Sequence, residues 1–197
     1  MTSGRRLKSI GLLGGLVVSG LTLLTWTGQW FSLGLGASGS GTTALSVTGG
    51  VAAPGLIALA LAGLALVAAL AIAGPVFRVV LGVLQALLGF TVAFSSVVAL
   101  ANPVAASSTA VTAATGVSGT ASVSALVLSV TQTAWPWIAV VVGVATIGLG
   151  IFVLASSRRW PGSSRRYQPV TFEPAEPGAN AVSDWDTLSG GSDPTSR

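Results

Sequence analysis

The residues with the clearest chemical potential are four arginines within nine positions near the end of the chain. They stand with two aromatic residues directly after an apolar stretch, and the set is Arg158, Arg159, Trp160, Arg165, Arg166 and Tyr167. Guanidinium groups at this density can bind nucleic-acid phosphates, bind anionic lipid headgroups, or keep the end of a membrane helix in the cytoplasm. Nothing around them predicts a fold that would shape a nucleic-acid groove, so we expect no nucleic-acid partner. We interpret the set as membrane-interface anchors, with the arginines near anionic lipid and the rings at headgroup level.

The other residue types exclude most catalytic chemistry. The chain contains no His and no Cys, and its five acidic residues lie within the last 25 positions, at Glu173, Glu176, Asp184, Asp186 and Asp193. Thiolate chemistry, imidazole chemistry and nearly all transition-metal sites therefore lack their side chains. The apolar segments also lack the carboxylates that proton relays and ion-coupled transporters use. We predict no catalytic residue, no cofactor and no metal, and therefore no enzyme.

One polar residue stands out inside the apolar segments, and it is Gln85. It belongs to a run of small and polar residues at spacings of 4, 3, 4, 4 and 3, made up of Arg78, Gly82, Gln85, Gly89, Ala93 and Ser96. This face should point into a helix bundle, with Gln85 near the middle of the bilayer and Ser19 and Thr146 at similar depth. We predict a polar contact among Gln85, Ser19, Thr146 and Ser96. Its role is open between an amide that joins helices and a contact for a substrate.

The elements that must position these residues are membrane helices. The chain has 197 residues, of which 51% are hydrophobic and only 7% charged, whereas a soluble domain carries about 25% charged residues. Four apolar stretches, residues 7–27, 54–73, 76–100 and 137–155, approach or exceed the roughly 20 helical residues that cross a bilayer. Gly74 and Pro75 separate the second from the third, which predicts an antiparallel hairpin. We therefore expect an all-α membrane protein: a four-helix transmembrane bundle in residues 1–155, with outer loops 28–53 and 101–136, and a tail in residues 156–197.

Basic residues set the expected orientation. If the N-terminus is cytoplasmic, eight Lys and Arg residues lie inside and none in the outer loops; the eight are Arg5, Arg6, Lys8, Arg78, Arg158, Arg159, Arg165 and Arg166. The positive-inside rule then places both termini in the cytoplasm and the protein in the plasma membrane. Cleavage of residues 1–37 as a signal peptide is the alternative, but the bulky WTGQWF does not fit a cleavage site. Small-residue spacings such as Gly11-xxx-Gly15-xxx-Ser19 are compatible with an oligomer.

The outer loops predict strands. Residues 29–35 and 43–48 alternate apolar and polar side chains, and GASGSG between them is typical of a flexible hairpin loop. Residues 125–133 are rich in β-formers. We expect a small extracytoplasmic β-hairpin or sheet, with irregular Ser/Thr/Gly loops as the alternative. Residues 104–119 have too little pattern for more than a short helix.

The cytoplasmic tail carries one compact motif in a composition typical of disorder. From Gly162 onward the sequence is rich in Pro, Gly and Ser. Within it, Ser183 can cap a helical turn that places Trp185 and Leu188 on one face beside two acids. We predict a docking segment for a protein partner in Asp184, Trp185, Asp186 and Leu188. The alternative is that Trp185 folds back onto the membrane face near Arg165 and Arg166.

Several motifs, in their order along the chain, resemble one family. They are LTWTGQW at residues 24–30, an Ala/Leu-rich segment after Pro54, Arg78 opening the third segment, TAWPW (Thr133–Trp137), RRWPGSSRRY, and DWDTLSGGSDPT (Asp184–Thr195). The whole chain resembles the tryptophan-biosynthesis-associated membrane proteins of actinobacteria, small four-span proteins named for genes near the trp operon. The resemblance implies a genomic association with tryptophan synthesis. It implies no reaction and no catalytic residues.

Three functions are consistent with these observations. The first is a non-enzymatic accessory, scaffold or regulatory protein of the membrane. The second is a carrier for an aromatic metabolite, which requires a lined cavity around Gln85, Ser96 and Ser19. The third is an envelope-facing binding or sensor module, which requires an aromatic-lined pocket near Trp30 and Trp135. A closed bundle favours the first function, and a wet cavity in the middle of the bundle favours the second.

Overall fold

The computed structural model describes residues 2–36, 42–157 and 189–190. The chain divides into two compact units, residues 1–161 and 162–197, and the elements of the first unit are α1 (Thr2–Thr27), β1 (Gln29–Gly36), β2 (Thr42–Thr48), α2 (Gly49–Ala52), α3 (Leu56–Ile72), α4 (Pro75–Ala101), α5 (Pro103–Ala106), α6 (Ser108–Thr115), α7 (Thr120–Leu126), β3 (Val127–Gln132) and α8 (Trp135–Ser156). The described chain is thus mostly helical, with one small sheet. The predicted tail, residues 156–197, lies outside the described residues apart from Ser156, which ends α8, Ser157, Ser189 and Gly190. Its docking motif lies wholly outside them.

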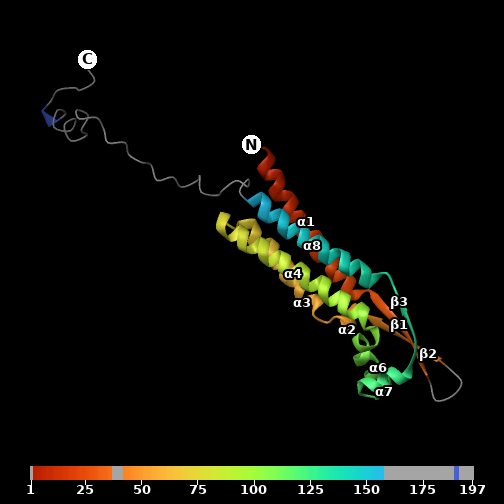
Figure 1. Ribbon diagram of the computed structural model, residues 1–197. Helices are drawn as coiled ribbons and strands as arrows, with labels where there is room; N and C mark the ends of the chain where they lie inside the picture. The colour runs from red at the N-terminus through yellow and green to blue at the C-terminus, as the bar shows by residue number, and fades with distance from the viewer. Residues whose placement is uncertain (1, 37–41, 158–188, 191–197) are drawn as a thin grey trace. The chain divides into compact units, whose positions relative to one another are not determined.

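Four helices run side by side as a bundle, α1, α3, α4 and α8 (Figure 1). Helix α1 packs against α3 and α8, and α4 packs against α8 and α3, which closes the ring. Among the described residues, Arg6–Thr27, Pro75–Ala101 and Trp135–Ser156 are long and apolar enough to cross a membrane, and α3, with 17 residues, is shorter. We call the end of the bundle at Gly74 and Pro75 the turn end, and the opposite end, where the strands gather, the sheet end.

The helix boundaries follow the apolar stretches with small shifts. Pro75 and Pro136 lie in the first turns of α4 and α8, where a missing N–H costs nothing. Helix α3 was expected from Pro54 but begins at Leu56. The reason is that Gly49–Ala52 form a separate turn of helix, and the amide of Leu56 donates to the carbonyl of Ala53 at 3.1 Å.

The closest helix contact joins α4 and α8. A Cβ atom added to Gly89 would lie 2.6 Å from the amide nitrogen of Ile147 and 2.7 Å from the carbonyl oxygen of Gly143. A Cβ added to Gly143 would lie 2.6 Å from the amide nitrogen of Ala93. The two backbones therefore touch, which is how membrane helices gain van der Waals contact where lipid offers no hydrophobic driving force.

The sheet has the order β2-β1-β3, with both pairs antiparallel. Between Gln29 and Phe31 the pairing of β1 with β2 shifts by one residue, so Trp30 is an extra residue in a β-bulge. Because of this bulge, Trp30 and Phe31 are both fully buried although they are neighbours in sequence. Their rings meet edge to face with centroids 6.3 Å apart.

The sheet end contains more helix than the sequence predicted. The segment after α4 begins with two short helices, α5 and α6, where at most one short helix was expected in residues 104–119. The strand expected in residues 125–133 is shorter, because Ala125 and Leu126 end helix α7, which buries Val123 against the sheet. The third strand is therefore confirmed only for Val127–Gln132. The inner face of the sheet, the ends of α3, α4 and α8, and these short helices share one apolar core.

Candidate functional site

Gln85 lies inside the bundle, on the buried face of α4. The buried residues of that helix are Arg78, Gly82, Gln85, Gly89, Val92, Ser96 and Ala99. Five of the six residues of the predicted small and polar face are among them, and the sixth, Ala93, is half-buried. Gln85 is 6% exposed, and its Nε2 atom has no hydrogen-bond partner among the described residues. It borders a cavity of about 10 Å³ whose other walls come from α1, α3 and α8 and include Gly11, Gly15 and Val67. A space of that size holds at most about one water molecule.

The other three predicted polar contacts lie in the same interior but do not bond to Gln85. The hydroxyl of Ser96 donates to the carbonyl of Val92 at 2.8 Å, and the hydroxyl of Thr146 donates to the carbonyl of Val142 at 2.7 Å. This is the usual bond of Ser and Thr to the carbonyl four residues earlier in a helix. Ser19 is 4% exposed and faces α3, where a Cβ on Gly63 would lie 2.5 Å from its hydroxyl oxygen. The hydroxyls therefore pack between helices, and the amide of Gln85 stands apart from them.

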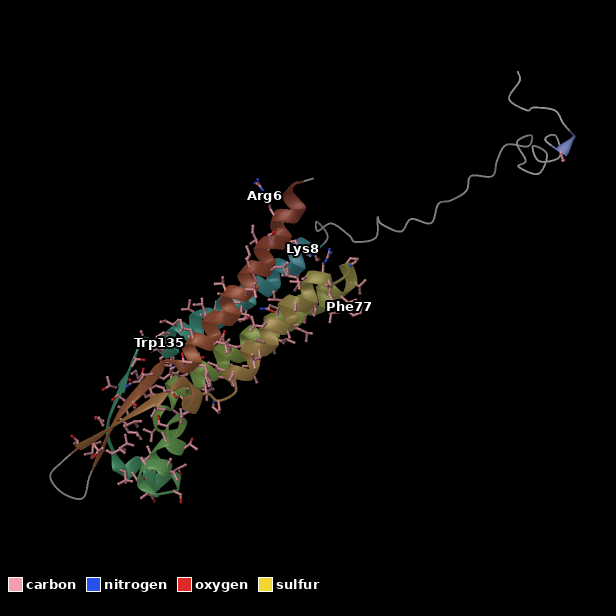
Figure 2. All side chains as sticks on the ribbon, turned by 180° about the vertical axis from the view of Figure 1, so that it is seen from behind. Arg6, Lys8, Phe77 and Trp135 are labelled. Carbon is pink, nitrogen blue, oxygen red and sulfur yellow. The ribbon has the colours of Figure 1, made fainter. Side chains whose placement is uncertain are left out.

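The turn end holds the basic side chains that the structure describes. Lys8 Nζ donates to the carbonyl of Ala71 at 2.7 Å, and Arg78 Nε donates to the carbonyl of Ala73 at 3.0 Å. Both carbonyls belong to the C-terminal end of α3, where backbone acceptors lack helical partners and the helix dipole is negative. Figure 2 shows Arg6 and Lys8 at this end, together with Phe77. The side chains of Lys8 and Arg78 thus cap the C-terminal end of α3, the shortest helix of the bundle.

At the sheet end, the two motifs LTWTGQW and TAWPW meet. The hydroxyl of Thr133 donates to the carbonyl of Gln29 at 2.5 Å and lies 3.2 Å from the carbonyl of Trp30. The amide of Thr133 donates to the same Trp30 carbonyl at 3.0 Å. A Cβ on Gly28 would lie 2.5 Å from the ring of Trp135, which Figure 2 places where α8 approaches the strands. The start of α8 is therefore locked to the end of α1.

Three tryptophans at this end, Trp26, Trp30 and Trp135, belong to the apolar core and line no pocket among the described cavities. Trp30 is completely buried, and its Nε1 donates to the carbonyl of Thr25 at 2.8 Å. A Cβ on Gly49 would lie 2.6 Å from both atoms of that bond. Trp26 Nε1 is buried without a partner among the described residues. The aromatic-lined pocket that a sensor would need at Trp30 and Trp135 is thus not found in this part of the structure.

The remaining predicted residues lie outside the described chain. These are the membrane-interface anchors Arg158, Arg159, Trp160, Arg165, Arg166 and Tyr167, and the docking segment Asp184, Trp185, Asp186 and Leu188. Sequence reasoning missed the contacts of Lys8 and Arg78 with α3 and the junction of the two tryptophan motifs. The sequence shows that Lys8 and Arg78 are basic. It carries no signal for the contact of Lys8 with Ala71, which lies 63 positions away.

Comparison with known proteins gives one match. The family model described as tryptophan-associated transmembrane protein covers residues 11–195. No curated protein and no solved structure matches the chain.

Proposed function

Since the chain belongs to the tryptophan-associated transmembrane protein family, and is thus a membrane protein with several candidate spanning helices, we propose that it is an accessory protein of the plasma membrane that holds or regulates a protein partner. It carries out no reaction of its own. Its membrane domain acts as a rigid anchor, and its cytoplasmic tail supplies the contact with the partner. The link to tryptophan synthesis that the family name suggests belongs to this proposal.

The observation that carries the proposal is the closed interior of the bundle. The α4 and α8 backbones touch at Gly89 and Gly143, and the space beside Gln85 is about 10 Å³. Small-molecule sites measure about 300–1,000 Å³, so a metabolite does not fit between the helices in this conformation. The absence of His, Cys and acidic residues before Glu173 likewise supports a role without catalysis or proton coupling.

The proposed arrangement is four spans with both termini in the cytoplasm. Helix α3 counts as a span because α1 leads away from the turn end and α3 leads back to it. The hydrogen bond from Lys8 in α1 to the carbonyl of Ala71 in α3 lies at that end. Its 17 residues extend about 25 Å at 1.5 Å per residue, which is a few ångströms short of a typical hydrocarbon core of about 30 Å. A mismatch of this size costs a fraction of a kcal/mol per ångström and is met by local thinning of the bilayer. The sheet then faces the outside.

The partner contact is assigned to Asp184, Trp185, Asp186 and Leu188, and the anionic-lipid contact to the arginines that follow α8. The test is crosslinking in native membranes of wild-type protein, Trp185→Ala with Leu188→Ala, and Phe172→Ala as the control for loss of a tail aromatic. We expect a crosslinked band of defined mass with wild type and with Phe172→Ala, and its loss from the double variant. An unchanged band in the double variant would show that Trp185 and Leu188 do not form the docking contact.

A transport assay separates the accessory role from the carrier. Liposomes that contain the purified protein should take up radiolabelled tryptophan and indole no faster than liposomes without protein. Saturable uptake that Gln85→Leu abolishes would replace the accessory role with transport.

A further inference from the structure

A second, larger cavity lies at the sheet end, outside the bundle interior. Its volume is about 470 Å³. The segment that leads into α3 forms one wall through Pro54 and Gly55. Helix α4 and its capping residue form the opposite wall through Phe94, Val98 and Asn102, and α5 closes the cavity on the side of Ala105. Unlike the space beside Gln85, this cavity is within the size range of ligand sites.

The cavity exists because neighbouring helices differ in length. Helices α3 and α4 meet at the Gly74–Pro75 turn, but α3 has 17 residues and α4 has 27. At 1.5 Å per residue, α4 extends about 15 Å beyond the start of α3. The short segment before α3 fills only part of that space, and the side of α4 from Phe94 to Asn102 keeps a groove.

The depth of the groove matches the boundary of the bilayer. Phe94 lies nineteen residues after Pro75, so it is about 28 Å from the turn end. If the turn end lies at headgroup level, in a bilayer about 40–45 Å thick with both headgroup regions, Phe94 is inside the hydrocarbon core of the opposite leaflet. Asn102 is the residue that caps α4 and is about 40 Å from the turn end, at headgroup level. The groove therefore runs from the acyl region into the headgroup region.

The lining fits an amphiphile without charge recognition. Phe94 and Val98 are 57% and 48% exposed, so the apolar part opens towards the surface that faces lipid. Ser95 and Asn102 are the polar side chains of the lining, and Asn102, at the headgroup end, can donate to an ester carbonyl. No charged residue occurs between Arg78 and Arg158, so the groove offers no cation to an anionic ligand.

We propose that this groove binds one phospholipid molecule of the leaflet at the sheet end. One acyl chain lies against Phe94 and Val98, and an ester carbonyl of the glycerol accepts a hydrogen bond from the side-chain amide of Asn102. The bound lipid fills the space that the short α3 leaves beside α4. The inference rests on the proposed crossing of the bilayer by the four helices, and it is independent of the tail, its partner and the orientation.

The test uses purified full-length protein in nanodiscs of ether-linked phosphatidylcholine, which has no ester carbonyls. The nanodiscs contain a small fraction of ester-linked phosphatidylcholine with a photoreactive group near the glycerol. After illumination, mass spectrometry maps the labelled peptides. Wild type should give saturable labelling of the segment around Phe94–Asn102, and excess unlabelled ester-linked phosphatidylcholine should compete for it. Ala105→Phe fills the groove, and Asn102→Leu removes its polar end. Each variant should weaken lipid binding about tenfold, and the label should fall in proportion.

Gly148→Phe is the matched control, because Gly148 is exposed on α8 with nothing within 4 Å of an added Cβ. It should leave the groove label unchanged. Label at Phe94–Asn102 that does not saturate and is equal in wild type and both groove variants would overturn the proposal, because it would mean ordinary contact with bulk lipid. Competition by indole and not by phosphatidylcholine would also overturn it and assign the groove to a soluble aromatic molecule. Absence of lipid label from the exposed faces of all four helices would instead contradict the spanning arrangement itself.

Discussion

The side-chain nitrogen of Lys8 and the carbonyl oxygen of Ala71 lie 2.7 Å apart. This contact places the beginning of α1 and the end of α3 at the same end of the bundle. Two helices therefore separate Lys8 from Ala71, one leading away and one returning. Arg78, at the start of α4, lies at the same end. The basic residues that the structure describes there are thus close in space, and they are also residues that the positive-inside rule assigns to one side of the membrane.

Gly89→Ala should destabilise the bundle strongly. The new methyl group would meet backbone atoms of α8 at 2.6 and 2.7 Å, and backbone cannot rotate away as a side chain can. We expect a loss of about 1–3 kcal/mol or more, as for other overpacked cores. Thermal unfolding in detergent measures it. Gly148→Ala, at a position with open space, is the control and should leave stability unchanged or slightly higher; equal behaviour of the two variants would contradict the α4–α8 contact.

Gln85→Leu should leave the protein folded and as stable as wild type or more so. The change replaces a buried amide whose Nε2 has no partner among the described residues with an apolar side chain of similar volume. Removing such an unsatisfied group recovers up to about 1–3 kcal/mol. Unfolding in detergent tests this. A clear loss of stability would show that the amide has a bonding partner in the folded protein, such as a water molecule in the neighbouring cavity.

Thr133→Val should loosen the junction between α1 and α8. The variant keeps the shape of the side chain but loses the hydroxyl that reaches the carbonyl of Gln29. A hydrogen bond of this kind contributes about 0.5–1.5 kcal/mol, and Thr133→Ser should retain it. Hydrogen exchange of the amides in β1 and at the start of α8 is the readout; faster exchange in Thr133→Ser than in Thr133→Val would be inconsistent with this role.

Trp30→Phe and Trp30→Ala should destabilise the sheet end in graded steps. Phenylalanine loses the bond to the Thr25 carbonyl, at a cost of about 1 kcal/mol, whereas alanine also leaves a cavity and should cost about 3–5 kcal/mol. Limited proteolysis of the outer segments reports both. Trp137→Ala, at a side chain that is 59% exposed, is the control. Proteolysis of Trp137→Ala as fast as that of Trp30→Ala would remove the core role assigned to Trp30.

The sequence was informative where one physical pattern dominates a segment. The length and apolarity of α1, α4 and α8 identified them, and the helical spacing from Arg78 to Ser96 identified the buried face of α4. The alternation in residues 29–35 predicted the inward side of Phe31, Leu33 and Leu35. It did not predict that Trp30 is also buried, because a β-bulge breaks the period of two.

Contacts between segments that are distant in the sequence could not be predicted from it. The amide of Gln85 was expected to find a partner at similar depth, but Ser96 and Thr146 bond within their own helices instead. The groove beside Phe94 arises from the difference in length between α3 and α4, and its lining comes from three separate segments. Neither feature has a local signal, because each depends on which helices become neighbours.

The most direct measurement of the proposed arrangement is the accessibility of single cysteines in intact cells. The chain has no Cys, so each introduced thiol reports alone. With a membrane-impermeant maleimide, Thr43→Cys in β2 and Thr120→Cys in α7 should be labelled in intact cells. Ser9→Cys near the start of α1 and Ser164→Cys in the sequence after α8 should be labelled only after the membrane is permeabilised. Labelling of Ser164→Cys in intact cells while Ser9→Cys stays protected would place the start of α1 and the sequence after α8 on opposite sides of the membrane and contradict four spans.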